Sequence, residues 1–155
     1  GVGMPYGIVA GQAWECESRV SLIDYQRAKT GALFVAATMA GAQAAGAPAE
    51  QWRAMGAWLG EAYQVADDIR DVVADPQLLG KPVGRDAALG RPSAAIELGL
   101  SGAIEHFHSL IQNVMDSIPE CPGAASLRAL ARAESERLVP LAMIDAARKE
   151  ARTVV

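Results

Sequence analysis

Residues 60–73 read Gly60-Glu61-Ala62-Tyr63-Gln64-Val65-Ala66-Asp67-Asp68-Ile69-Arg70-Asp71-Val72-Val73, an otherwise apolar helical pattern that contains three aspartates. On a helix, Asp67 and Asp71 are four residues apart and share one face, separated by about one turn of ~5.4 Å. Like charges at this spacing destabilise a helix by roughly 0.2–0.5 kcal/mol per pair. Burying them without compensation costs far more. A bound cation would remove both costs, and a solvated acidic face is the alternative.

Magnesium is the cation that this cluster predicts. Mg²⁺ prefers carboxylate oxygens, and it usually takes one or two carboxylates and completes its shell with water and substrate phosphate. Gln64 lies three residues before Asp67 on the same stripe of the helix. We therefore expect a Mg²⁺–diphosphate site with Asp67, Asp68 and Asp71 as metal ligands, while the solvated acidic face stays open as the alternative.

Composition favours one helical domain, or half of a larger one, because the chain has 155 residues and 51% are hydrophobic. Many of these are alanines, which suit close helix packing. The net charge is −4 and aromatic residues make up 5% of the chain. The basic residues are scattered rather than clustered, so we expect no nucleic-acid surface.

The cellular setting is indicated by the cysteines and by one uncharged segment. Cys16 and Cys121 are isolated, which makes a zinc site improbable and fits a reducing compartment. Residues 30–49 carry no charge, but they are mostly Ala and Gly and include Pro48. We expect a buried helix there rather than a membrane span, with no secretory signal, and hence a cytoplasmic protein that is not integral to a membrane.

The pattern along the chain predicts an all-α protein. Helices are expected over residues 4–16, 21–45, 48–74, 93–118 and 126–152, with a Gly- and Pro-rich loop over 75–92. Pro48 fits the first position of its helix. Ser93 opens one helix and Ser101 another before residue 118, and Pro140 is expected to kink or split the last helix. No strand pattern is convincing.

Other residues also fit phosphate chemistry. Lys29 and Thr30 lie on an otherwise apolar helix, Lys81 lies in the loop after the acidic helix, and Arg91 ends that loop. Together with the acidic cluster, these cations could hold a diphosphate against a metal. Taken singly, each has a plainer interpretation: Lys29 snorkels to solvent, the loop charges are ordinary, and Gln64 is a satisfied core amide.

Several segments, in this order and spacing, resemble the C-terminal half of a trans-prenyl diphosphate synthase. They are Gly11-Gln12-Ala13-Trp14-Glu15, residues 25–34 (Tyr-Gln-Arg-Ala-Lys-Thr-Gly-Ala-Leu-Phe), residues 59–71 and residues 79–86 (Leu-Gly-Lys-Pro-Val-Gly-Arg-Asp). The resemblance covers about residues 7–92. It is strongest to bacterial geranylgeranyl diphosphate synthases of carotenoid-making phototrophs.

This resemblance implies an all-α bundle of the isoprenoid synthase type and condensation of isopentenyl diphosphate with an allylic diphosphate. It implies that Asp67 binds Mg²⁺ directly, that Asp68 and Asp71 act directly or through water, and that Lys29, Asp67 and Asp68 are catalytic. Lys29, Thr30 and Lys81 would hold the allylic diphosphate, with Gln64 in support. Arg91 stands where the family often has Lys, and Arg70 replaces a common apolar residue.

The first aspartate-rich motif and the upstream basic site of the family have no counterpart in this sequence. We therefore expect a C-terminal half of a single prenyltransferase domain, inactive by itself and homodimeric in the whole enzyme. Apolar faces around Leu33, Phe34, Trp58 and Tyr63 should then be exposed and prone to association. The alternative is a non-catalytic helical partner subunit or interaction module.

Overall fold

The computed structural model describes residues 7–14, 16, 27–73, 93–142, 144 and 145, and all its regular elements are helical. They are α1 (Ile8–Trp14), the π-helix η1 (Arg27–Gly31), α3 (Ala32–Ala44), the 3₁₀-helix η2 (Ala49–Trp52), α4 (Arg53–Val73), α7 (Ala94–Asp116) and α8 (Ala124–Leu138). The all-α prediction is confirmed. The expected loop over 75–92 and the expected helical residues 21–26 lie outside the described residues.

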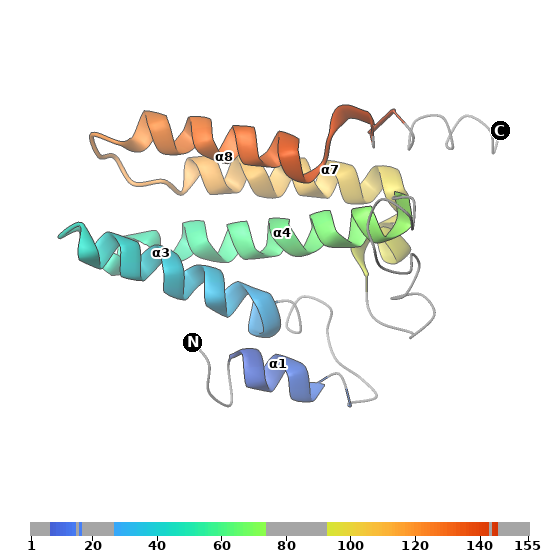
Figure 1. Cartoon of the computed structure of the whole chain (residues 1–155), viewed down its shortest axis with the longest axis horizontal. Coiled ribbons are helices and arrows are strands. Elements are labelled where there is room, and N and C mark those ends of the chain that lie inside the picture. The colour runs from blue at the N-terminus through green and yellow to red at the C-terminus, as the bar shows by residue number, and fades with distance from the viewer. Residues whose placement is uncertain (1–6, 15, 17–26, 74–92, 143, 146–155) are drawn as a thin grey trace.

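The acidic helix α4 is the centre of the arrangement. It packs against α7 on one side and against η1 and α3 on the other, while α8 lies along α7 and α1 lies beside η1 (Figure 1). The acidic end of α4 therefore lies next to the beginning of α7, the element that follows it among the described residues.

A continuous apolar core joins α4 to α7. On α4 the fully buried residues recur at helical spacing and include Val65, Ala66 and Ile69. They face a stripe on α7 that includes Phe107 and Leu110, which are 0% and 2% exposed. This packing fixes the rotation of α4 about its axis and thereby decides which acidic side chains face inward.

Helix ends depart from the expected bounds where Pro or Gly intervenes. Pro48 is the extended N-cap of η2 rather than its first helical residue. Gly99 has φ 70° and ψ 166°, a glycine-favoured conformation that divides α7 near the expected start of a second helix. The expected helix over 126–152 begins at Ala124 and is split as Pro140 predicted: α8 ends at Leu138, and residues 141, 142, 144 and 145 are helical again. Residues 143 and 146–155 lie outside the described part.

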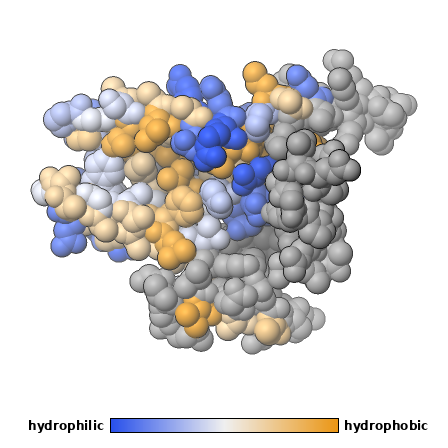
Figure 2. Space-filling model, viewed as in Figure 1, coloured by the Kyte–Doolittle hydropathy of each residue, from blue (hydrophilic) through white to orange (hydrophobic). Residues whose placement is uncertain are grey.

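The prediction of a buried helix within residues 30–49 is wrong for most of α3, where only Ala42 is buried. Leu33 of α3 and Tyr63 of α4 are 44% and 40% exposed, as expected for these faces, whereas Phe34 and Trp58 are half-buried. Figure 2 shows the α3 edge mostly in the hydrophobic colour. Among the described helices, none is long and apolar enough to cross a membrane.

Candidate functional site

Two glycines of α4 let its backbone touch the preceding helices. A Cβ atom on Gly60 would lie 2.7 Å from the Cα atom of Gly31 in η1. One on Gly56 would lie 2.7 Å from the Cα atom of Val35. Real Cβ atoms essentially never approach so closely, so only glycine fits at both positions. The close approach brings Thr30 of η1 within reach of Gln64, one turn after Gly60.

A hydrogen-bonded chain starts at Thr30 and crosses three elements. The Thr30 hydroxyl donates to Gln64 Oε1 at 3.1 Å, and Gln64 Nε2 donates to Asp68 Oδ1 at 3.0 Å. The other carboxylate oxygen, Asp68 Oδ2, accepts the backbone N–H of Ala94 at 2.8 Å. The chain therefore connects η1, α4 and the first residue of α7.

The direction of these bonds follows from Asp68. An ionised carboxylate only accepts, so the Gln64 amide must turn its NH₂ group toward Asp68 and its carbonyl toward Thr30. The Thr30 hydroxyl then has to act as the donor. Gln64 is thus a satisfied, part-buried amide, as its plainer interpretation predicted, and it also connects two candidate site residues.

Burial separates the three aspartates and contradicts the solvated acidic face. Asp68 is 1% exposed and Asp71 is 6% exposed, whereas the Asp67 side chain is 39% exposed. The guanidinium nitrogen Arg70 Nη2 lies 3.5 Å from Asp67 Oδ1, and Arg70 Nε donates to the Ala66 carbonyl at 3.3 Å. This ion pair is long and partly exposed, so it stabilises the fold by at most about 1 kcal/mol. A metal ion could therefore take the place of Arg70 beside Asp67.

The basic candidates are described only in part. Lys29 belongs to η1, but its side chain is outside the described part of the structure. Lys81 and Arg91 lie outside the described residues entirely. The π-helical turn that carries Lys29 and Thr30 is itself informative, because single π turns occur frequently at functional sites.

The donor chemistry at the end of α4 fits Mg²⁺. Asp67 and Asp71 are one helical turn apart and offer hard carboxylate oxygens, and Mg²⁺ needs only one or two of these when substrate phosphates and water complete its shell. Within the described ranges, no three His, Cys, Asp or Glu residues are grouped to hold a metal by themselves. The residues present thus fit a metal that is shared with a phosphorylated ligand.

Two groups near the site were missed by sequence reasoning. The first is Glu61, 8% exposed on α4, whose Oε1 atom lies 3.7 Å from His106 Nε2 on α7. Glu61 lies seven residues, or about two helical turns, before Asp68 and therefore shares its face of α4. This spacing is the sequence signal that could have pointed to Glu61. The second is the Ala94 backbone N–H, which has no signature in a sequence. His106 is half-buried, whereas His108 is exposed.

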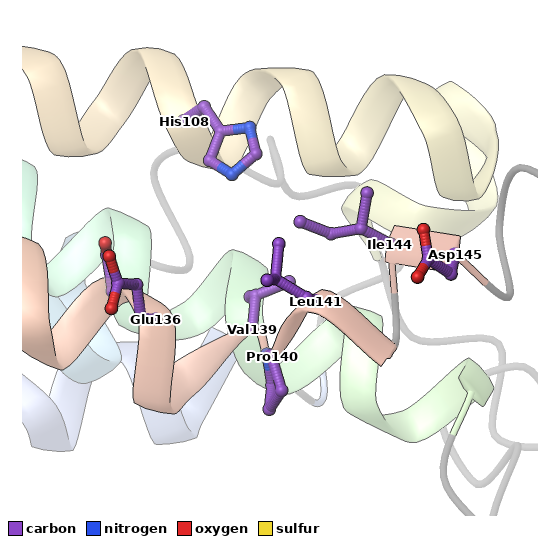
Figure 3. Close-up of a pocket in the computed structure, with 8 residues that line it drawn as sticks. His108, Glu136, Val139, Pro140, Leu141, Ile144 and Asp145 are labelled. Atoms are coloured by element: carbon purple, nitrogen blue, oxygen red, sulfur yellow. The ribbon is translucent and has the colours of Figure 1, made fainter.

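A cavity of about 680 Å³ lies elsewhere, where α8 ends beside α7. It is lined by both charged and apolar side chains: His108, Ser135, Glu136, Val139, Pro140, Leu141, Ile144 and Asp145 (Figure 3). None of the candidate diphosphate or metal residues is among them. We assign this cavity no ligand.

Comparison with known proteins gives the family to which this chain belongs. The polyprenyl synthetase family model matches residues 4–127, so the chain belongs to the polyprenyl synthetase family. It is 51% identical over 138 residues to a geranylgeranyl diphosphate synthase of Cereibacter sphaeroides, covering 89% of this chain and 48% of that protein. It is 44% identical over 135 residues to the synthase of the same name from Rhodobacter capsulatus, covering 87% and 47%.

The fold agrees with this assignment. The crystal structure of geranylgeranyl pyrophosphate synthetase from Pyrococcus horikoshii Ot3 superposes with a TM-score of 0.62 at 24% identity, covering 81% of this chain and 53% of that one. The all-α fold of the isoprenoid synthase type is therefore shown. The chain spans about half the length of these two curated relatives.

Proposed function

We propose that this chain carries the second aspartate-rich motif of a trans-prenyltransferase that adds isopentenyl diphosphate to an allylic diphosphate. A geranylgeranyl diphosphate synthase is the specific activity proposed, because both relatives described above bear that name. The observation that carries the proposal is the arrangement at the end of α4. Two aspartates are buried there, a third is accessible, and Thr30 of the π-helical turn is linked through Gln64 to Asp68.

The proposed roles follow from chemistry and exposure. Asp67, with Asp71 one turn further on, would hold Mg²⁺, and the metal when bound would stabilise the negative charge of the diphosphate. Lys29, Thr30, Lys81 and Arg91 would bind the diphosphate oxygens. Gln64 would hold Thr30 in place through the 3.1 Å hydrogen bond. Asp68 was also expected to bind the metal, and its role is taken up below.

The assembly proposed is a cytoplasmic homodimer of the whole enzyme. Cys16 and Cys121 are free thiols, which fits a reducing compartment. The exposure of Leu33 and Tyr63 favours a partner surface over this edge. The same exposure also supports the second candidate function, a non-catalytic helical partner subunit of a prenyl synthase. The two functions differ in whether the acidic residues are needed for turnover.

The first test is product formation by the protein expressed from its complete reading frame. We expect incorporation of labelled isopentenyl diphosphate into a geranylgeranyl product when an allylic diphosphate and Mg²⁺ are supplied. Chelation of the metal should abolish incorporation, and added Mg²⁺ should restore it. Failure to incorporate label with any allylic diphosphate, by folded protein, would contradict the proposed activity and favour the partner-subunit function.

A further inference from the structure

Asp68 differs from the other two aspartates in what its oxygens contact. Both oxygens accept hydrogen bonds from the protein, Oδ1 from Gln64 and Oδ2 from the Ala94 backbone, and the residue is 1% exposed. A carboxylate that binds a metal directly has to present a lone pair of one oxygen to that metal. These two contacts of Asp68 are instead directed into the protein.

The beginning of α7 needs such an acceptor. A helix starts with four backbone N–H groups that have no partner within the helix, and a buried one is costly if left unpaired. Here Ser93, Ala94 and Ala95 are 3%, 3% and 8% exposed, so water does not readily replace a missing acceptor. Ser93 occupies the N-cap position, but its side chain makes no capping hydrogen bond.

Asp68, on α4, therefore supplies the hydrogen-bond acceptor that the Ser93 side chain does not provide at the start of α7. Its carboxylate lies at the N-terminal end of α7, where the helix dipole favours negative charge. The same carboxylate fixes the orientation of the Gln64 amide, and Gln64 in turn holds the Thr30 hydroxyl. One side chain thus ties the start of α7 and the Thr30 turn to the acidic end of α4.

We propose that Asp68 is a positioning residue that caps α7 and orients Gln64 and Thr30, rather than a direct ligand of the metal. This inference rests on the proposed function for its effect on turnover. Asp67, which is more exposed and lies one residue earlier, then remains for direct metal binding together with Asp71 one turn further on. The two adjacent aspartates then have different tasks: Asp67 binds the metal, and Asp68 caps α7.

Asparagine separates the two roles at this position. In Asp68→Asn, the new side-chain carbonyl could still accept the Ala94 N–H. The new NH₂ group would face Gln64, and a flip of the Gln64 amide would restore that hydrogen bond, with Thr30 then accepting. Asp68→Asn therefore keeps the connections but removes the negative charge, whereas Asp68→Ala removes both. Asp67→Asn is the matched variant at the proposed metal ligand.

The experiment compares these three variants in the protein expressed from its complete reading frame. The readouts are the Mg²⁺ concentration for half-maximal turnover, the melting temperature and amide hydrogen exchange at residues 94–97. For Asp68→Ala we expect faster exchange at these residues, a melting temperature lower by about 5 °C and reduced kcat, with half-saturating Mg²⁺ changed less than about twofold. Asp68→Asn should restore exchange and melting temperature to wild-type values and most of kcat.

The result that would overturn the inference is equally specific. If Asp68→Asn raises half-saturating Mg²⁺ about tenfold or more, as expected for Asp67→Asn, while exchange at residues 94–97 stays protected, Asp68 is a metal ligand. If instead Asp67→Asn leaves the Mg²⁺ dependence unchanged, the proposed metal function fails. The capping role then still stands on the exchange and melting data, so the two failures are distinguishable.

Discussion

Replacing Asp67 by alanine in the protein expressed from its complete reading frame should lower turnover by about 10²–10³-fold while leaving its far-UV circular dichroism almost unchanged. Losing one preorganised group that stabilises developing charge typically costs this much in rate. The Asp67 side chain is 39% exposed, and its ion pair with Arg70 is long, at 3.5 Å. Asp67 is the most exposed of the three aspartates, so we expect the fold to lose little when its carboxylate is removed.

Asp116→Ala is the matched control for this experiment. Asp116 is an exposed aspartate near the end of α7, and it accepts a hydrogen bond from Gln112 on the same helix. The control also removes a carboxylate and one surface contact, but far from the acidic end of α4. We expect turnover within about twofold of wild type, and equal activity of the Asp67→Ala and Asp116→Ala proteins would refute the role given to Asp67.

Replacing Gly60 by alanine should destabilise the protein by about 1–3 kcal/mol or more, because overpacking of a tight contact costs this much. The new Cβ atom would meet the Gly31 Cα atom at 2.7 Å, and both atoms belong to helical backbones that cannot move independently. Relief requires η1 to move away from α4, which would also lengthen the Thr30–Gln64 hydrogen bond. Thermal unfolding and turnover should therefore both suffer.

Gly41→Ala makes the same chemical change but should raise the stability of the protein rather than lower it. Gly41 is an exposed interior residue of α3, and a Cβ atom there would have nothing within 4 Å. Alanine is favoured over glycine in a helix interior by roughly 0.8–1.0 kcal/mol, so this variant should be slightly more stable than wild type. If Gly60→Ala were as stable as Gly41→Ala, the close packing of η1 on α4 would be incorrect.

The sequence predicted the elements better than it predicted their faces. Helical spacing over residues 60–73 was sufficient to place the acidic helix. Pro48 and Pro140 were sufficient to expect breaks at their positions, and Ser101 was sufficient to expect a new helix near residue 100. The sequence predicted a buried helix within residues 30–49, because a run of alanines looks the same whether or not another helix covers it. Leu33 is instead 44% exposed.

At the site, residue types and order carried the prediction, and tertiary contacts supplied the rest. Asp67, Asp68 and Asp71 are alike in sequence, and only the packing of α4 on α7 shows that Asp68 points toward Ala94 while Asp67 stays accessible. The group at Ala94 that needs a hydrogen-bond acceptor is its backbone N–H, and every residue except proline carries such a group. No sequence pattern distinguishes the one that needs a partner.

Calorimetric titration of inorganic diphosphate into the protein from its complete reading frame, with and without Mg²⁺, tests the central claim most directly. The account predicts that diphosphate binds measurably only when Mg²⁺ is present, and that Asp67→Asn weakens this binding at least tenfold, or about 1.4 kcal/mol. Asp116→Asn should bind as wild type does. Diphosphate binding that is independent of Mg²⁺, or equal in the Asp67→Asn protein, would contradict a metal–diphosphate site at the acidic end of α4.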